Sequence, residues 1–522
     1  MNSGIRRVFQ NANVIDGTGS PATLQDVAIQ GDQIVAMGHN LIADARYTMD
    51  CTGKVLTPGF IDIHTHSDFN ILLQPGMESS LSQGVTTEIF GNCGIAIGLA
   101  TNADVFVLER RALDKAGTAI NWDDMQGFLT RLADQGVALN VASLAGHGTM
   151  RKRVMGISER QPSPSELLML CRDAENAMRA GAVGLSSGLE YVPGIYADVN
   201  ELATLARVVH EWGGFYATHL RDEGDFLYEA VSEAISVARI SGIRLQLSHH
   251  KAELRRNWGK IASTLQLVSD SIDSGMDILL DQYPYTAYQT SLQTIVIPRW
   301  ANAADPDGLA RTLAVEASRK RIEAEMAQQD WAAIRIANCQ HHQDYVGKSL
   351  ADIALDKGVH PAQFVLDLLA EGGPWISAVH HAMSPEDVAT VMQDPRVMIG
   401  SDSVATDSLE PSLDQPHPRT FGTFATVLGT YVRDKNVLTL PDAIRKMTSL
   451  PASRLRWQDR GRLAIGYKAD LVLLDPDVVG ATATFEAPRQ RAAGIEQVWV
   501  NGVLAHEKGL PTGSRSGHVY RA

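Results

Sequence analysis

Two histidines stand two positions apart directly after an apolar segment near the start of this 522-residue chain. They are His64 and His66, and the segment before them is Val55–Ile63. Residues two apart on an extended strand project from the same face, so both imidazoles would enter one space. Neutral imidazoles readily bind zinc and other transition metals. The alternative for a lone pair of this kind is solvent-exposed or core histidines, but its position after a strand favours a metal site.

A cysteine with glycine neighbours follows the next apolar segment. Cys93 lies in Gly91-Asn92-Cys93-Gly94, directly after Val85–Phe90. Glycine allows a backbone to approach a cavity closely, and a thiolate there would be a soft zinc ligand. A single cysteine can equally be a buried, inert thiol.

Further candidates follow later apolar segments. They are His219, the adjacent pair His249 and His250, and Asp402. A bound metal lowers the pKa of water from about 15.7 towards 7, and a nearby carboxylate can move the proton. This set of residue types therefore indicates metal-dependent hydrolysis, with Asp402 as the general base.

Alternating apolar runs and helical patterns in the middle of the chain must position these residues. Helical patterns cover, for example, Glu201–Trp212 and Tyr228–Ser241. The alternation predicts an α/β fold with a (β/α)8 barrel, in which active groups lie at the carboxyl ends of the strands. The expected strands are Val55–Ile63, Val85–Phe90, Ala138–Ala145, Ala182–Ser186, Phe215–His219, Ile243–Ser248, Met276–Leu280 and Val397–Ile399.

Both ends of the chain look β-rich, with short apolar runs between glycine-containing turns. We expect them to form one small β-sandwich domain from residues 1–55 and 455–522. Residues 56–454 would then form the barrel of a metal-dependent hydrolase. Within the barrel domain, residues 286–335 are too long for a simple loop and predict an insertion or lid.

The composition narrows the partners and the location. Lys and Arg number 46 and Asp and Glu 60, a net charge of −14, which argues against a nucleic-acid partner. The four cysteines form no CxxC pair and no disulfide framework. The first residues lack the apolar core of a signal peptide, and no run of about 18 apolar residues predicts a membrane span. We expect a soluble, cytoplasmic protein, and no oligomeric state follows from the sequence.

At this point the chain resembles the amidohydrolase superfamily, whose mark is Pro-Gly-Phe-Ile-Asp-x-His-x-His, here from Pro58 to His66. Other motifs resemble the D-aminoacylase family, the N-acyl-D-amino-acid deacylases, over nearly the whole chain. These motifs are Gly84–Thr87, Gly91–Gly94, Gly184–Tyr191, Ser248–Lys251, Tyr283–Tyr285, His417–Arg419, Gly422–Phe424 and Gly466–Val472.

The resemblance implies roles for these residues. Cys93, His219 and His249 would hold a tightly bound Zn²⁺, with His249 preferred to His250. A second, weaker or empty metal position would lie among His64, His66 and Asp402. Metal-bound hydroxide would attack an N-acyl-D-amino acid or a related small N-acylated or dipeptide-like compound, giving a carboxylate and a free amino acid. The residues expected to face this substrate are Lys251, Tyr191, Tyr283 and Arg419.

The sequence departs from the family where substrate specificity is expected. Thr286–Leu292 lacks the expected small residues, and Lys251 is followed by Ala252-Glu253. Arg299 could bind an acidic side chain of the substrate, or it could be a solvated surface charge.

Two other functions stay open. A cyclic-amide hydrolase of the hydantoinase or dihydropyrimidinase type would need a bridging carboxylated lysine, and an inactive amidohydrolase-like scaffold would have lost metal ligands.

Overall fold

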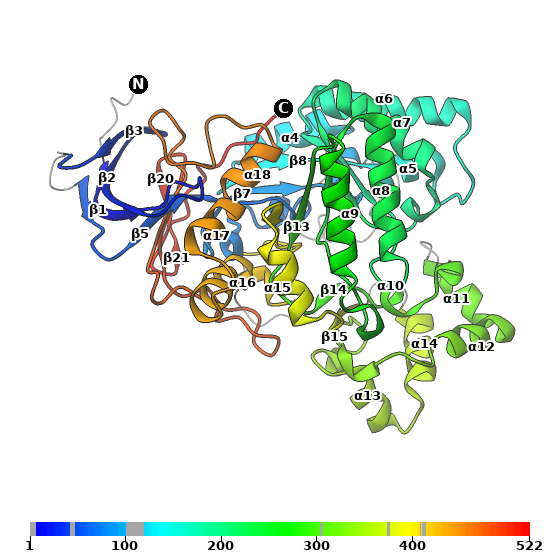
Figure 1. Ribbon diagram of the computed structural model, residues 1–522. Helices are drawn as coiled ribbons and strands as arrows, with labels where there is room; N and C mark the ends of the chain where they lie inside the picture. Colours follow the sequence, from blue (N-terminus) through cyan, green and yellow to red (C-terminus); the bar gives the residue numbers. More distant parts are fainter. Residues whose placement is uncertain are drawn as a thin grey trace.

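The computed structural model describes residues 7–41, 47–100, 120–302, 306–372, 376–407, 409 and 414–522. Three parts are visible in Figure 1: a β-domain, a central barrel and an inserted module. The expectation of no signal peptide concerns the first six residues, which lie outside these ranges.

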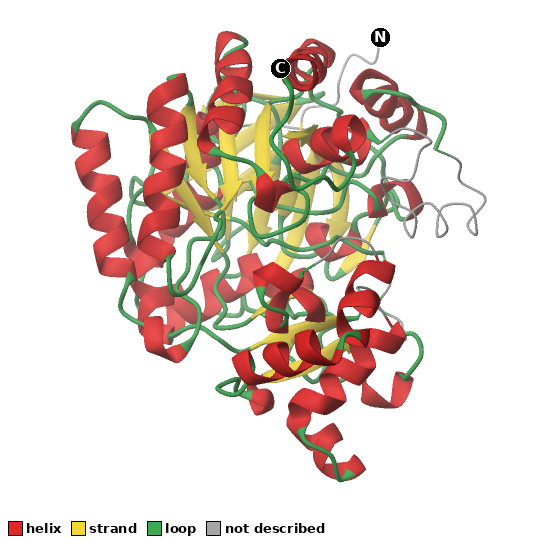
Figure 2. Ribbon diagram, turned by 90° about the vertical axis from the view of Figure 1, so that its right-hand side faces the viewer, coloured by secondary structure: helices red, strands yellow, loops and turns green. Residues whose placement is uncertain are grey.

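Parallel strands form the centre of the molecule and are enclosed by helices (Figure 2). One sheet has the order β6-β7-β8 and the other the order β9-β10-β11-β12-β13-β17, and only Leu144 separates β8 from β9. A parallel bridge between Thr65 and Ser403 joins the first barrel strand to the last. This closed arrangement confirms the predicted α/β barrel. The strands are β6 (Phe60–Asp62), β7 (Val85–Phe90), β8 (Asn140–Ser143), β9 (Ala145–Gly146), β10 (Gly184–Gly188), β11 (Phe215–His219), β12 (Arg244–Leu247), β13 (Ile278–Gln282) and β17 (Val397–Ile399).

The helices between the strands begin and end at typical capping residues. In α6, Ser163 and Glu166 form a reciprocal capping box, Pro164 occupies the first turn, and Gly181 ends the helix at a φ of 109°. Asp198 caps α7 by accepting from the Glu201 amide. The main helices around the barrel are α4 (Met125–Gln135), α5 (His147–Met155), α6 (Pro164–Ala180), α7 (Val199–Glu211), α8 (Leu227–Ser241), α9 (Ile261–Asp273), α15 (Pro385–Gln393), α16 (Arg419–Thr426), α17 (Leu440–Met447) and α18 (Ser449–Arg454).

The first expected strand, Val55–Ile63, is divided in two. Its first part, β5 (Val55–Pro58), pairs within the β-domain, and its second part, β6, pairs with β7 of the barrel. The break falls at Gly59, where an added Cβ would lie 2.2 Å from Thr86 Oγ1. The backbone thus crosses from one domain to the other at a point where it lies too close to Thr86 to leave room for a side chain.

Both ends of the chain combine in one β-domain, as predicted, and its strands form one nine-stranded sheet (Figure 1). The N-terminal strand β5 pairs antiparallel with the C-terminal strand β18. Phe9 and Trp499 pack edge to face in its core, with ring centroids 5.6 Å apart. The division at residues 55 and 455 stays a prediction. The remaining strands are β1 (Arg7–Val14), β2 (Thr23–Gln30), β3 (Gln33–Gly38), β4 (Thr48–Asp50), β18 (Leu471–Leu474), β19 (Ile495–Val500), β20 (Val503–Glu507) and β21 (Leu510–Pro511).

The inserted module is longer than the expected 286–335. Its antiparallel sheet has the order β14-β16-β15, so the central strand, β16, comes last in the sequence and ends at His380. A separate apolar core, including Leu309, Ile336 and Val365, holds the module together. Its elements are β14 (Tyr288–Ser291), α10 (Leu292–Val296), α11 (Pro306–Ala314), α12 (Glu316–Glu325), β15 (Ile334–Asn338), α13 (Leu350–Lys357), α14 (Pro361–Gly372) and β16 (Ser377–His380).

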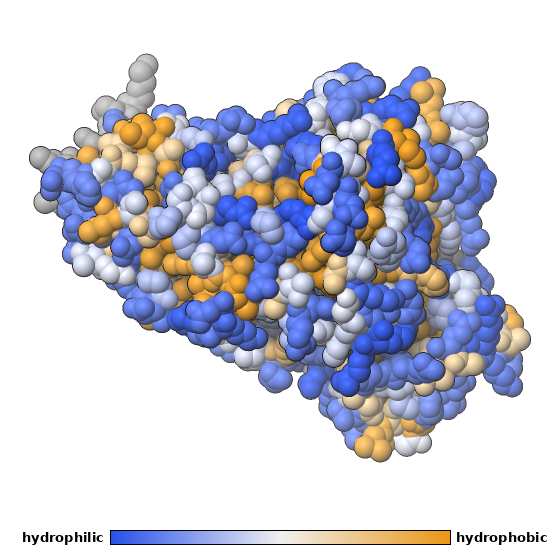
Figure 3. Space-filling model, in the orientation of Figure 1, coloured by the Kyte–Doolittle hydropathy of each residue, from blue (hydrophilic) through white to orange (hydrophobic). Residues whose placement is uncertain are grey.

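Hydrophilic residues cover most of the face shown in Figure 3, and apolar residues are scattered over it or lie in small groups. Within the described ranges, no helix combines the length and the apolar composition needed to cross a bilayer.

Candidate metal centre

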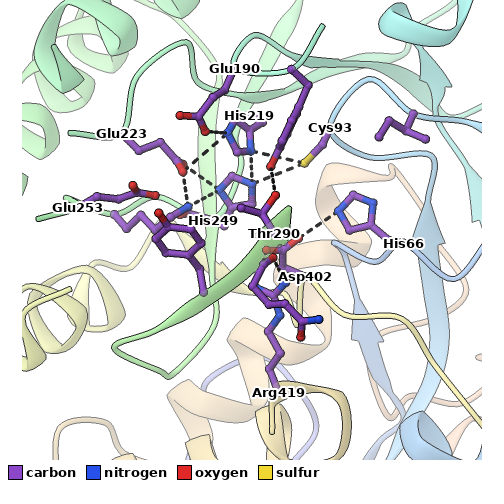
Figure 4. A pocket seen from close by; sticks show the side chains of 15 residues that line it. His66, Cys93, Glu190, His219, Glu223, His249, Glu253, Thr290, Asp402 and Arg419 are labelled. Atoms are coloured by element: carbon purple, nitrogen blue, oxygen red, sulfur yellow. Dashed lines mark hydrogen bonds and ion pairs between the residues drawn. The ribbon is translucent and has the colours of Figure 1, made fainter. Parts of the chain in front are cut away.

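The strand ends bring the Cys93 thiol together with the imidazoles of His219 and His249 (Figure 4), and the imidazole of His64 joins them. Cys93 Sγ lies 3.5 Å from His249 Nε2 and 3.9 Å from His219 Nδ1. It also lies 3.4 Å from His64 Nε2. The two ring nitrogens of His219 and His249 face each other at 2.9 Å. All four side chains are buried, so these donor atoms point at one another rather than at solvent.

Three residues of this centre have left-handed backbone conformations. The φ angles are 50° at Cys93, 35° at His249 and 51° at Asp402. Non-glycine residues rarely adopt such angles, and strain of this kind gathers at functional sites because the surrounding structure enforces it. At each position the chain has just left a strand and turns a side chain into the barrel. The orientation of His249 therefore comes from this turn, since β12 already ends at Leu247.

The glycines around Cys93 allow its loop to pack against β10. A Cβ at Gly94 would lie 2.8 Å from the Gly188 amide nitrogen, and a Cβ at Gly188 would lie 2.2 Å from the Cys93 carbonyl oxygen. Ser186 Oγ accepts a hydrogen bond from the Gly94 amide at 3.0 Å. The glycine motif is thus explained by a close backbone contact that fixes the thiol.

A carboxylate holds the other ring nitrogen of each converging histidine. This second contact fixes the ring orientation and the tautomer, an arrangement typical of histidines that bind metals. The pairs are His64 Nδ1 with Asp281 Oδ1 at 3.0 Å, His219 Nε2 with Glu190 Oε2 at 3.0 Å, and His249 Nδ1 with Glu223 Oε1 at 2.9 Å.

The sequence analysis assigned no role to these three carboxylates. Asp281 lies at the carboxyl end of β13, one residue beyond the expected strand, so the search of strand ends could have found it. Glu223 follows His219 by four residues in a loop, and Glu190 directly precedes Tyr191. Neither of these two has a periodic signal that distinguishes it from a surface glutamate.

The charges around Cys93 favour its thiolate form. Burial by itself would raise the pKa of the thiol, but the charge of His64 and hydrogen bonds with His219 and His249 outweigh it. The pKa of Cys93 consequently lies well below its ordinary value. A thiolate is the form that binds metal ions.

These donors fit zinc. One ligand atom each from His64, Cys93, His249 and Asp402 lies within 4.8 Å of the others, and His219, Glu223 and His249 form an overlapping group. Thiolate sulfur and imidazole nitrogen are the preferred ligands of Zn²⁺. The sequence predicts His64 beside Asp402. Its Nε2 lies 3.5 Å from Asp402 Oδ1 and also 3.4 Å from the Cys93 sulfur.

His66 lies at the edge of this centre, and His250 lies outside it. His66 Nε2 is 3.1 Å from Asp402 Oδ1, and its side chain is 25% exposed, on the outer side of the centre. His250 turns away from the cavity and bonds to Thr264 Oγ1 at 2.9 Å. Of the adjacent pair, only His249 reaches the thiol.

A cavity of about 200 Å³ lies beside the metal centre. Tyr191, Lys251 and Arg419 line it, as do Gln289 and Thr290 from the inserted module. The expected substrate-facing residues therefore come together in one space, with one exception described next.

Tyr283 lies behind the cavity wall. Its ring is buried, 5.0 Å from the Arg419 guanidinium carbon and 5.9 Å from Lys251 Nζ. Tyr283 therefore contacts the two cations, and it does not line the cavity as expected.

Both cations of the cavity already have carboxylate partners. Arg419 Nη1 donates to Asp402 Oδ2 at 2.7 Å, and Lys251 Nζ pairs with Glu223. Arg299 pairs with Asp222 at 3.1 Å, is 40% exposed at its side chain, and does not line this cavity. Its position favours the surface-charge interpretation.

Comparison with known proteins identifies the family. Residues 47–506 match the amidohydrolase family. The N-acyl-D-glutamate deacylase of Alcaligenes xylosoxydans xylosoxydans is 37% identical over 514 residues, which cover 98% of this chain and 96% of that protein.

Solved structures agree with this match. A D-aminoacylase described with a binuclear metal centre has a TM-score of 0.83 and 33% identity, with 99% of each chain covered. The N-acyl-D-glutamate deacylase of Bordetella bronchiseptica, complexed with zinc and a phosphonate inhibitor, has a TM-score of 0.84 and 32% identity, covering 99% of this chain and 100% of that one. The chain belongs to the amidohydrolase family, among the D-aminoacylases and N-acyl-D-amino-acid deacylases.

Proposed function

We propose that this protein hydrolyses the amide bond of N-acyl-D-amino acids, giving a carboxylate and a free D-amino acid. The observation that carries the proposal is the convergence of the Cys93 thiol with the nitrogens of His219 and His249, beside the Asp402 carboxylate. The relatives named as deacylases of N-acyl-D-amino acids support the substrate class.

Cys93, His219 and His249 would hold one zinc ion tightly. His64, His66 and Asp402 would form a second, weaker position, and the binuclear centre described for a related D-aminoacylase supports it. When bound, zinc polarises the scissile carbonyl and lowers the pKa of a coordinated water.

Asp402 would act as the general base and then as the acid. Burial by itself would raise the pKa of Asp402, but Arg419 and His249 lower it well below its ordinary value, so the carboxylate is ionised and can accept a proton. Arg419 holds Oδ2, while Oδ1 faces the two histidines His64 and His66. Asp402 would take the proton of the attacking water and deliver it to the leaving amide nitrogen.

Lys251, Arg419 and Tyr191 would orient the substrate. A charge-assisted hydrogen bond from a guanidinium or an ammonium group suits the free carboxylate of an N-acyl amino acid. The Tyr191 hydroxyl lies 3.3 Å from Thr290 Oγ1 and so connects the barrel to the inserted module across the cavity. Tyr283 would act indirectly, through its contacts with the two cations.

Two alternatives have less support. In a cyclic-amide hydrolase a carboxylated lysine would bridge the metals, whereas here Cys93 lies among the histidines and Lys251 pairs with Glu223. An inactive scaffold is disfavoured because all six candidate positions hold residue types that can bind a metal. Metal analysis separates the last case, since a scaffold would bind no stoichiometric zinc.

The four cysteines have free thiols, which supports a cytoplasmic location.

The decisive experiment for the activity is a screen of N-acetyl-D- and N-acetyl-L-amino acids, acidic, apolar and basic, with amine release as the readout. We expect turnover of D-compounds that is lost when a chelator removes zinc and restored when zinc is added back. No turnover of any compound by the zinc-loaded protein would refute the proposal.

A further inference from the structure

Four carboxylates line the cavity, and one of them, Glu253, has no role in the proposed hydrolysis. Asp402 contacts His66 and Arg419. Glu223 pairs with Lys251 and His249, and Glu190 holds His219. Among the described residues, none places a cationic or imidazole nitrogen within 4 Å of the Glu253 carboxylate.

Because no cationic group of the described residues pairs with it, we propose that Glu253 makes the enzyme prefer N-acyl-D-amino acids whose side chain carries a positive charge, such as those of D-lysine and D-ornithine. This inference rests on the proposed deacylase function and adds the substrate side chain to it.

The main chain of Glu253 is fixed on both sides, so its place in the cavity wall is defined. The Glu253 amide donates to the Glu223 carbonyl oxygen at 2.8 Å. The Glu253 carbonyl oxygen accepts from Asn257 Nδ2 at 2.9 Å. Its side chain lies on the same side of the cavity as Glu223 (Figure 4). It also interacts with the phenol of Tyr288.

The charge of the cavity favours a cation at this place. Among the described lining residues, Lys251 and Arg419 carry the permanent positive charges, and each is paired with a carboxylate. An acidic side chain bound here would have to compete for these two cations with Glu223, with Asp402 and with the free carboxylate of the substrate, and it would approach Glu253. A basic side chain would instead lie beside the Glu253 carboxylate and pair with it, and a buried charge needs such a partner.

The electrostatic state of Glu253 agrees with a missing counterion. Burial and the neighbouring charge of Glu223 raise the pKa of the Glu253 carboxyl well above its ordinary value, and Lys251 offsets this only in part. An ammonium group beside Glu253 would oppose that shift and restore the carboxylate.

Three substrates and two variants test the preference on the zinc-loaded enzyme. N-acetyl-D-lysine and N-acetyl-D-norleucine differ by the terminal amine, and N-acetyl-D-glutamate tests the opposite charge. We expect kcat/KM for the lysine compound to exceed that for the norleucine compound about tenfold, the effect of about one well-placed interaction. The glutamate compound should be the slowest of the three.

The variant Glu253→Gln keeps the shape of the side chain and removes its charge, so the lysine-to-norleucine ratio should fall to within about twofold of one. Glu316→Gln, on the exposed surface of α12, serves as the matched control and should leave the ratio unchanged. Turnover of the norleucine compound by the Glu253→Gln enzyme shows that the variant is folded.

Each failure has its own meaning. Equal or faster hydrolysis of the norleucine compound by the wild-type enzyme overturns the inference, even if the variant does not fold. A ratio unchanged in Glu253→Gln overturns the role of this residue. In both cases the deacylase function stands, because a neutral substrate is still cleaved. If no compound is cleaved at all, the proposed function fails and this inference fails with it.

Discussion

The buried carboxylate of Glu223 joins a candidate zinc ligand, His249, to a candidate substrate-binding cation, Lys251. Its Oε1 lies 2.9 Å from His249 Nδ1, its Oε2 pairs with Lys251, and its side chain is 1% exposed. Glu223→Gln preserves the shape of the side chain and removes the charge that both partners require. The change should therefore weaken zinc binding and destabilise the fold together.

The structure sets the size of both effects. Loss of a carboxylate that orients a metal-binding histidine weakens metal affinity roughly 10- to 100-fold, or about 1.4–2.7 kcal/mol. Lys251 would also be left buried without its counterion, and breaking a buried pair in this way costs roughly 3–5 kcal/mol of folding stability.

Glu190→Gln is the matched control, because Glu190 holds the other histidine. Its Oε2 lies 3.0 Å from His219 Nε2, but the side chain is 26% exposed, and no lysine in the described part of the chain forms an ion pair with it. Since solvent can replace part of this contact, we expect less than about a tenfold loss of zinc affinity and a stability change below about 1 kcal/mol.

Competition with a chromogenic chelator gives the dissociation constant for zinc, and urea denaturation of the zinc-free proteins gives the stability. The reasoning is refuted if Glu223→Gln binds zinc within twofold of the wild-type affinity. It is also refuted if Glu190→Gln proves the more damaging change in either measurement.

Three other predictions concern the centre and the β-domain. Asp402→Asn should retain zinc and lower kcat about 10²- to 10⁴-fold through loss of the general base, so activity within tenfold of wild type contradicts that role. Cys93→Ala should reduce the zinc content of the purified protein, and an unchanged stoichiometry by elemental analysis rules the thiol out as a ligand. Burial lowers the pKa of His506 to about 4. In the unfolded chain the His506 imidazole binds a proton below about pH 6.5, whereas in the native state it does so only below about pH 4. The free energy of unfolding therefore falls as the pH falls through this window, by about 2 kcal/mol at pH 5. His506→Phe should remove this loss of stability. Urea denaturation midpoints at pH 7 and pH 5 would measure it in both proteins, and an equal loss of stability in the variant would show that His506 is not its source.

The barrel and most of the candidate ligands could be predicted because their signals are local. Buried parallel strands appear as short apolar runs, and chemistry in this fold lies where those runs end. Cys93, His219, His249 and Asp402 all occupy such positions. The extent of the inserted module could not be predicted in this way, because its central strand, β16, pairs with segments distant in the sequence.

The sequence by itself determined the fold class, the family and the residue types of the candidate metal centre, of which His64 is the first along the chain. Only the tertiary structure decided which atoms meet. Left-handed backbone angles, and not strand alternation, turn Cys93 and His249 towards each other. Contacts between distant segments pair Asp281 with His64, 217 residues away, and among the described residues they bring no cationic nitrogen within 4 Å of the Glu253 carboxylate. Such pairings depend on how the strand ends close around one cavity, and periodicity along the chain carries no information about them.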